Sequence, residues 1–408
     1  MKIEQIYTGC LSQGAYYIYS EGEVAIIDPM REVGSYIQKA EADNATIVYV
    51  FETHFHADFV SGHVSLAEKT GASIVFGPTA STNYKIRNAN DREEFKVGAL
   101  TITALHTPGH TTESTCYLLR DASGKEVAIF TGDTLFLGDV GRPDLAQKTE
   151  GLTTEVLAGK LFDSLRTKIM PLADDLLVYP GHGAGSACGK NMMKATVDTL
   201  GNQKKHNYAL RSDMTKEEFV EQVTSELNAP PSYFPLNVAL NKNGYEDVDA
   251  IIKKGNTALS PERFEAVAKA SNAIVLDVRH QFEFAKSHIP SSIFIGIDGS
   301  FAPWVGALIV DVQQPILLVV DEDAVEETIT RLSRVGFDGT LGYLKGGMQA
   351  WKAAGKETDC LEELTAEEFA STANNNDIAM FDVRKQSECD SGMVARAAYT
   401  PLTDFNTY

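Results

Sequence analysis

The sequence has no long apolar run and few basic residues, and each shortage excludes a class of protein. No stretch approaches the ~18–20 apolar residues of a membrane-spanning helix. The N-terminal MKIEQIYTGCLSQG lacks the basic-then-apolar pattern of a secretory signal. Only 36 Lys and Arg residues stand against 56 Asp and Glu residues, which gives a net charge of −20. Such a surface repels phosphate groups, so we expect neither a nucleic acid nor a membrane as partner.

Cysteine is also scarce. The five cysteines are odd in number, form no C-x-x-C pair and are scattered over the chain: Cys10, Cys116, Cys188, Cys360 and Cys389. A secreted disulfide framework would show an even number at regular spacings. We therefore expect reduced thiols and a cytoplasmic location.

A chain of 408 residues is too long for one ordinary core, so we expect two or three domains. The first ~190 residues alternate short β-branched runs with helical stretches, as in an α/β fold. Five runs predict buried strands, at residues 25–28, 46–51, 100–105, 127–131 and 176–179. Polar side chains, Gly or Pro follow these runs, which favours a site at one edge of a sheet.

Four of the nine histidines lie in motifs that follow these predicted strands. The motifs are Thr-His-Phe-His-Ala-Asp at 53–58, Thr-Pro-Gly-His at 107–110, Thr-Gly-Asp at 131–133 and Pro-Gly-His at 180–182. Imidazole and carboxylate groups on rigid strand ends are typical of a divalent metal site. A single histidine would more simply be a core or loop residue, and we assign that role to His63, His106, His206, His280 and His288.

These motifs, in this order, resemble the metallo-β-lactamase superfamily. The resemblance implies an αββα sandwich with the metal site between its two sheets. In binuclear members such as glyoxalase II, the first motif ends in a further histidine that binds a second metal. Phe59 occupies that position here, and a phenyl ring has no lone pair to offer. We therefore expect one metal.

Within the superfamily the chain is similar to the multidomain bacterial persulfide dioxygenases, also called sulfur dioxygenases. The similarity lies in Gly-Asp-Val-Gly-Arg-Pro-Asp at 138–144 and Gly-His-Gly-Ala-Gly-Ser-Ala-Cys-Gly at 181–189. It implies one Fe(II) per chain, held by His54, His110 and Asp133, with Zn able to replace it in purified protein. It also implies that O2 oxidises a small thiol persulfide, such as that of glutathione or coenzyme A, to sulfite and thiol.

The proposed chemistry also gives roles to residues around the metal. We expect His56, Asp58 and His182 to orient the ligands and the proton positions around the metal. Arg142 is the candidate for binding a substrate carboxylate, with an ordinary salt bridge as the alternative. Cys188 is a candidate neighbour of the substrate, with a buried inert thiol as the alternative. We also expect a homo-oligomer.

The C-terminal part repeats itself. Ser-Pro-Glu-Arg-Phe at 260–264, Asp-Val-Arg at 277–279 and Glu283 each have a counterpart 105 positions later, at 365–369, 382–384 and 388. A constant spacing of this size predicts two copies of one domain, the second of them incomplete.

The first copy resembles the rhodanese family through Asp277-Val278-Arg279, His288-Ile289-Pro290 and Gly346-Gly347. A rhodanese places its nucleophilic cysteine after a strand and before a helix. The predicted strand 316–320 is followed by Asp321, which cannot carry sulfur, so we expect an inactive domain. We expect Asp321 or Asp323 to cap the next helix instead.

We therefore predict a metallo-β-lactamase-type catalytic domain at 1–235 and a connector at 236–257. A rhodanese-like domain without the catalytic cysteine follows at 258–357, and an incomplete second rhodanese domain at 358–408. Two alternatives stay open: a Zn-dependent thioester hydrolase of the glyoxalase II kind, and a non-catalytic sulfur-binding scaffold or sensor. Phe59 weighs against the first, and the intact set His54, His110 and Asp133 against the second.

Overall fold

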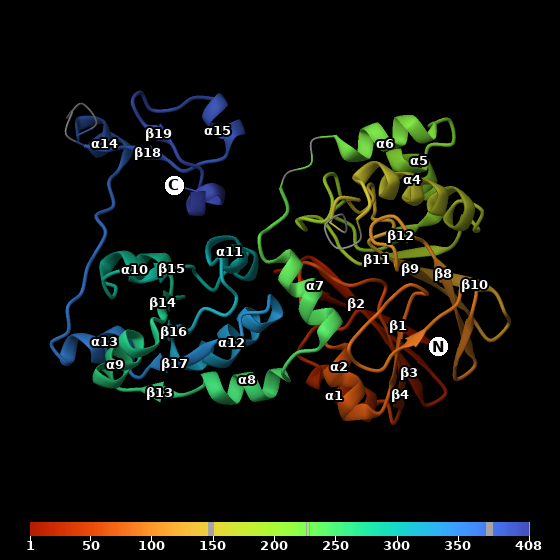
Figure 1. Cartoon of the computed structure of the whole chain (residues 1–408), viewed down its shortest axis with the longest axis horizontal. Coiled ribbons are helices and arrows are strands. Elements are labelled where there is room, and N and C mark those ends of the chain that lie inside the picture. Colours follow the sequence, from red (N-terminus) through yellow and green to blue (C-terminus); the bar gives the residue numbers. More distant parts are fainter. Residues whose placement is uncertain (146–150, 226, 228, 373–377, 408) are drawn as a thin grey trace. The chain divides into compact units, whose positions relative to one another are not determined.

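The computed structural model describes residues 1–145, 151–225, 227, 229–372 and 378–407. The chain divides into two compact units, shown in Figure 1. One comprises Met1–Ala250 with Ser333–Gly336, and the other Ile251–Leu332 with Phe337–Tyr408. Over the described ranges, no helix combines the length and the apolar character needed to cross a bilayer.

Two six-stranded sheets form the centre of the first unit. The first runs in the order β1 (Lys2–Thr8), β2 (Gln13–Ser20), β3 (Glu23–Ile27), β4 (Thr46–Phe51), β5 (Ser73–Phe76) and β6 (Arg87–Asn88). The second runs in the order β12 (Asp198–Thr199), β11 (Leu177–Pro180), β10 (Glu126–Gly132), β9 (Thr115–Arg120), β8 (Leu100–His106) and β7 (Glu94–Val97). The five predicted strands are confirmed as β3, β4, β8, β10 and β11.

Side-chain alternation explains why these sheets are layered. In β2, Tyr16 and Ile18 join an apolar core that also takes residues of β8, β9 and β10 from the second sheet. Tyr17, which points the other way, packs in a separate core with Tyr36 of α1 (Gly34–Ala42). Successive strand side chains point to opposite faces, so each sheet is buried on both sides. The second sheet is covered in the same way, because Leu118 joins a core with helical residues. The predicted αββα sandwich is confirmed.

The remaining helices of this unit come mainly from its C-terminal half. They are α2 (His63–Thr70), α4 (Thr154–Ser164), the π-helix η1 (Leu165–Ile169), α5 (Leu200–His206), the 3₁₀ turn η2 (Tyr208–Leu210), α6 (Lys216–Thr224) and α7 (Phe234–Asn243). α6 begins with a capping box, in which Thr215 accepts from the Glu218 N–H and Glu218 accepts from the Thr215 N–H. With α8 (Val248–Gly255), α7 occupies most of residues 236–257, which we expected to form a connector. Pro235 fits the first turn of α7, where its missing N–H is not needed.

The second unit contains a five-stranded sheet whose neighbouring strands are all parallel. Its order is β13 (Ala258–Leu259), β17 (Thr340–Leu344), β16 (Ile316–Val319), β14 (Ile274–Asp277) and β15 (Ile293–Phe294). Its helices are α9 (Pro261–Ser271), α10 (Gln281–Lys286), α11 (Phe301–Leu308), the 3₁₀ turn η3 (Glu322–Ala324), α12 (Val325–Arg334) and α13 (Gly347–Ala353). Leu317 and Val319 of the central strand pack with Phe264 and Trp351, which accounts for the apolar run of β16.

The internal repeat is visible in the backbone. β18 (Phe381–Asp382) pairs with β19 (Ala398–Tyr399) as β14 pairs with β15, 105 positions earlier. Arg384 bonds Asp382 as Arg279 bonds Asp277. The second copy also contains α14 (Ala366–Thr372), α15 (Gln386–Asp390) and the 3₁₀ turn η4 (Leu402–Thr407). The partial second copy is therefore built like the start of the first.

Candidate metal centre

Three buried donor groups converge at the ends of strands in the sandwich. His54 follows β4, His110 follows β8, and Asp133 follows β10. Asp133 Oδ2 lies 3.5 Å from His110 Nε2 and 3.9 Å from His54 Nε2, and none of the three residues is more than 2% exposed. The three ligand atoms lie within 4.8 Å of one another. The structure therefore brings together the three residues that we expected to bind the metal.

The hydrogen bonds of His54 and His110 engage Nδ1 and leave Nε2 available for a metal. His110 Nδ1 lies 2.8 Å from the Arg142 carbonyl oxygen, which can only accept, so Nδ1 carries the proton. His54 Nδ1 lies 3.0 Å from the Thr53 hydroxyl, which itself donates to Asp28. In the neutral rings both Nε2 atoms keep a lone pair, and among the described residues Asp133 Oδ2 has no hydrogen-bond partner. Two imidazole lone pairs and one carboxylate fit a divalent first-row metal.

The electrostatics of the centre favour the unprotonated donors. Burial, together with the neighbouring His56, lowers the pKa of His54 well below 6.5. Burial alone would raise the pKa of Asp133, but His182 and His54 lower it far below its usual range. These are the protonation states that a metal requires of its ligands.

A second group of donors lies on the other side of Asp133. His182 Nδ1 donates to Asp133 Oδ1 at 2.8 Å, and His182 Nε2 lies 2.7 Å from Asp58 Oδ2. Cys188 belongs to the same group and is 1% exposed. Burial raises the pKa of Cys188 well above 9.0, and Asp58 adds to this effect, so the group is a thiol. Asp58, His182 and Cys188 thus lie together beside Asp133.

His56 is held by two buried carboxylates that the sequence reasoning missed. Its Nε2 lies 3.2 Å from Asp28 Oδ1 and 3.3 Å from Glu52 Oε2. Burial opposes charge on His56, but Asp28 and Glu52 outweigh it and raise its pKa to about 10. Within the described part of the chain, His56 Nδ1 has no hydrogen-bond partner. Both acids directly follow strands that lead to the site, and this position was the signal that could have identified them.

Phe59 places an apolar ring, not a metal ligand, at the position after Asp58. Its side chain is fully buried, and its ring centroid lies 4.4 Å from that of His56. The ring therefore fills space beside the metal-binding motif and donates nothing to a cation.

A close approach explains the glycine of the Pro-Gly-His motif. A Cβ atom on Gly181 would lie 2.7 Å from Asp133 Oδ1, closer than real Cβ contacts. Gly132, before Asp133, has a φ of +49°, in the left-handed region that favours glycine. Gly181 thus lets the backbone approach the carboxylate of Asp133, and Gly132 allows the turn that precedes it.

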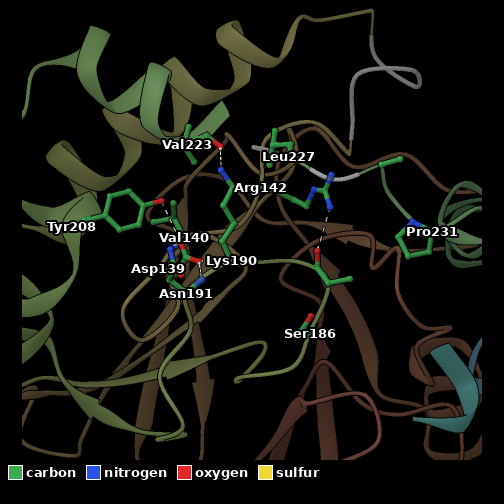
Figure 2. Close-up of a pocket in the computed structure, with 13 residues that line it drawn as sticks. Asp139, Val140, Arg142, Ser186, Lys190, Asn191, Tyr208, Val223, Leu227 and Pro231 are labelled. Carbon is green, nitrogen blue, oxygen red and sulfur yellow. Dashed lines mark hydrogen bonds between the residues drawn. The ribbon is translucent and has the colours of Figure 1, made fainter. Parts of the chain in front are cut away.

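Arg142 forms the ordinary salt bridge that was its alternative role. Its Nε and Nη2 atoms donate to the two carboxylate oxygens of Asp144, each at 2.7 Å. It also lines a cavity of about 480 Å³, shown in Figure 2, together with Ser186, Lys190 and Tyr208. Because Asp144 already occupies the fork of the guanidinium, a substrate carboxylate would have to displace it.

Two of the histidines that we assigned to structural roles have clear protein partners. His63 Nδ1 lies 3.4 Å from Glu52, and its Nε2 contacts the hydroxyl of Tyr84 at 2.6 Å. His106 Nε2 lies 2.8 Å from the Thr112 carbonyl oxygen.

In the rhodanese-like unit, Asp321 follows β16 where the nucleophile would stand. It precedes η3, but its side chain makes no capping hydrogen bond, and Asp323 lies inside that turn. Asp321 therefore stands at the N-cap position of the next helical turn, as predicted, but its side chain does not supply the capping hydrogen bond. Asp321 and Glu322 line a cavity of about 560 Å³ with Gly346 and Gly347.

Comparisons with known proteins agree with this architecture. Residues 8–182 match the metallo-beta-lactamase superfamily, and residues 260–354 match the rhodanese-like domain. A metallo-beta-lactamase from Staphylococcus aureus of known structure has a TM-score of 0.74 at 31% identity, covering 85% of this chain and 99% of that chain. The structure of ETHE1 from Myxococcus xanthus has a TM-score of 0.51 at 28% identity, covering 59% of this chain and 98% of that chain.

Curated relatives are named as hydrolases. The hydroxyacylglutathione hydrolase GloC of Haemophilus influenzae is 30% identical over 212 residues, 47% of this chain and 94% of that protein. Alignments with three other relatives, named as established or probable hydroxyacylglutathione hydrolases, cover 58%, 48% and 66% of their lengths. The chain belongs to the metallo-β-lactamase superfamily. Its N-terminal part has the fold of this enzyme superfamily, and a rhodanese-like domain follows it.

Proposed function

We propose that this chain is an Fe(II)-dependent persulfide dioxygenase. It would convert a small thiol persulfide by R–S–SH + O2 + H2O → R–SH + H2SO3. The outer sulfur is oxidised to the level of sulfite, O2 is reduced, and the S–S bond breaks to release the thiol.

The observation that carries the proposal is the composition of the donor set. His54, His110 and Asp133 would hold the metal, and two imidazoles with one carboxylate are the set that non-haem Fe(II) oxygenases use. When bound, Fe(II) would supply the redox chemistry that O2 requires and would accept a soft sulfur anion. Phe59 supports a single metal, because it offers no ligand beside Asp58.

The protein groups around the centre have roles of their own. His182 donates to Asp133 Oδ1 and so fixes the direction of Oδ2 towards the two histidines. The Arg142 carbonyl oxygen fixes the ring of His110, so this residue acts on the centre through its backbone. Burial of Asp58, His56 and Cys188 keeps bulk water from a reactive persulfide.

The second candidate is a Zn-dependent thioester hydrolase, and two observations favour it. The curated relatives carry that name, and Asp58, His182 and Cys188 form a second set of metal-type donors. A metal-bound water with a pKa near ~7 would then be the nucleophile. The rhodanese-like domain, typical of sulfur chemistry, weighs towards the dioxygenase.

The test compares metals and substrates in the full chain. Apo-protein is reconstituted without air with Fe²⁺ or with Zn²⁺, because Zn²⁺ displaces Fe²⁺ from many such sites during expression. We expect the Fe²⁺ form to consume O2 and release sulfite with glutathione or coenzyme A persulfide, and the His110→Ala variant to do neither. Thioester hydrolysis by the Zn²⁺ form, with no O2 uptake by the Fe²⁺ form, would establish the hydrolase instead.

A further inference from the structure

A side chain of α7 holds the loop that carries the first metal ligand. We call residues 54–61, from His54 to Ser61, the metal loop. Asn241 is 1% exposed, and its amide bonds three backbone groups of this loop. Nδ2 donates to the carbonyl oxygens of His56 at 2.8 Å and Phe59 at 2.9 Å, and Oδ1 accepts from the Ser61 N–H at 2.9 Å.

These backbone groups need such a partner. The metal loop is buried along its whole length, so water cannot replace a lost hydrogen bond. An asparagine amide offers two donors and one acceptor in a single plane, and Asn241 uses all three on the loop. A side chain without both donors would leave at least one buried carbonyl group without its partner.

Other groups fix the metal loop independently of Asn241. The Glu113 carboxylate accepts from the Phe55 N–H at 2.8 Å. Glu52 accepts from the Ser61 hydroxyl at 2.6 Å and faces His56. The shape of the loop between His54 and Asp58 is therefore set jointly by the sheet end and by α7.

α7 lies outside residues 8–182, the part of the chain that matches the superfamily. We propose that Asn241 is a positioning residue of the metal centre. Through Asn241, helix α7 contributes to the geometry of the metal site. Asn241 acts through the metal loop and does not touch the donor atoms of His54, His110 or Asp133. The proposal rests on the metal centre of the proposed function, but not on whether its reaction is oxidation or hydrolysis.

The experiment measures metal binding by the full chain. The Zn²⁺ dissociation constants of the apo forms of wild type, Asn241→Ala and Asn241→Ser are measured by chelator competition, and the visible spectra of the Co²⁺ forms are recorded. Asn237→Ala is the matched control. Asn237 lies one turn earlier in α7 and is fully buried, and among the described residues its amide has no hydrogen-bond partner.

We expect both Asn241 variants to bind Zn²⁺ about 10–100-fold more weakly and to show a changed Co²⁺ spectrum, as loss of a supporting contact does. Asn237→Ala should keep both properties of the wild type, even if its melting temperature falls as far. The Ser variant keeps the measurement possible if the Ala variant does not fold. Unchanged Zn²⁺ affinity in a folded Asn241 variant, or an equal loss in Asn237→Ala, would overturn the proposal. Absence of O2 uptake by wild type would overturn the dioxygenase and leave this inference intact.

Discussion

His182 Nδ1 lies 2.8 Å from Asp133 Oδ1, and this contact decides which carboxylate oxygen faces the metal-binding histidines. With Oδ1 engaged, Oδ2 is the oxygen that lies 3.5 Å from His110 Nε2. His182 is itself held by Asp58, so the carboxylate, the imidazole and the second carboxylate form one buried chain.

The first prediction removes this support. His182→Ala should weaken metal binding about 10–100-fold, because Asp133 loses the donor that orients it. Metal titration of the apo-protein measures the change. His106→Ala is the control, since the ring of His106 contacts the Thr112 carbonyl oxygen and none of the metal-binding residues among those described. Equal metal affinity of wild type and His182→Ala would contradict the role that we assign to His182.

The second prediction asks whether His56 is a metal ligand. His56→Gln keeps a hydrogen-bond donor for Asp28 and Glu52, the two buried carboxylates that face His56. If His54, His110 and Asp133 are the complete protein ligand set, this variant still binds one metal per chain through the same ligands. X-ray absorption of the metal form should count two imidazole ligands in wild type and variant alike. A third imidazole in wild type that disappears in His56→Gln would assign the unpartnered Nδ1 to the metal and favour the hydrolase.

Short-range patterns predicted the strands and the motifs at their ends, and the resemblance of these motifs to the metallo-β-lactamase superfamily implied the sandwich and the three converging donors. β4, β8 and β10 are runs of apolar residues that end in His or Asp motifs, so their identity and the residues at their ends could be read directly. Asn241 could not be found in this way. It reaches the metal loop across 180 positions to Ser61, and it lies where Pro and Asn residues suggested a connector. A long-range contact to backbone atoms leaves no pattern in a single sequence.

The sequence also did not determine which charged side chains form pairs. Arg142 and Asp144 stand two positions apart, and only the structure showed that the guanidinium is already occupied. Glu52 directly precedes Thr53, and nothing in the motif marks it as the partner of His56 and His63. A buried ion pair forms only where the fold brings two loops into contact, and such contacts depend on the complete fold.

The third prediction concerns Phe59. Phe59→His should raise the metal content from one towards two per chain, because the new imidazole would add a donor next to Asp58 in the same buried loop. Elemental analysis after Zn²⁺ reconstitution measures this. The same change should lower the free energy of unfolding of the metal-free protein by about 1–3 kcal/mol, because it buries a polar ring without a compensating hydrogen bond. Two metals already in wild type would contradict the single-metal prediction and favour the second donor group of Asp58, His182 and Cys188.

The last prediction concerns the rhodanese-like domain, which should transfer no sulfur as it stands. Asp321→Cys would place a thiol in the cavity of about 560 Å³ that Gly346 and Gly347 help to line. Attack of this thiolate on the outer sulfur of thiosulfate would form a cysteine persulfide and release sulfite. Mass spectrometry of the peptide should show the gain of one sulfur atom at residue 321. Asp323→Cys is the matched control, because Asp323 is an exposed acid of the same turn that does not line this cavity. Persulfide formation at 323 but not at 321 would mean that the cavity does not preserve a sulfur-accepting geometry, and that the domain differs from an active rhodanese by more than its nucleophile.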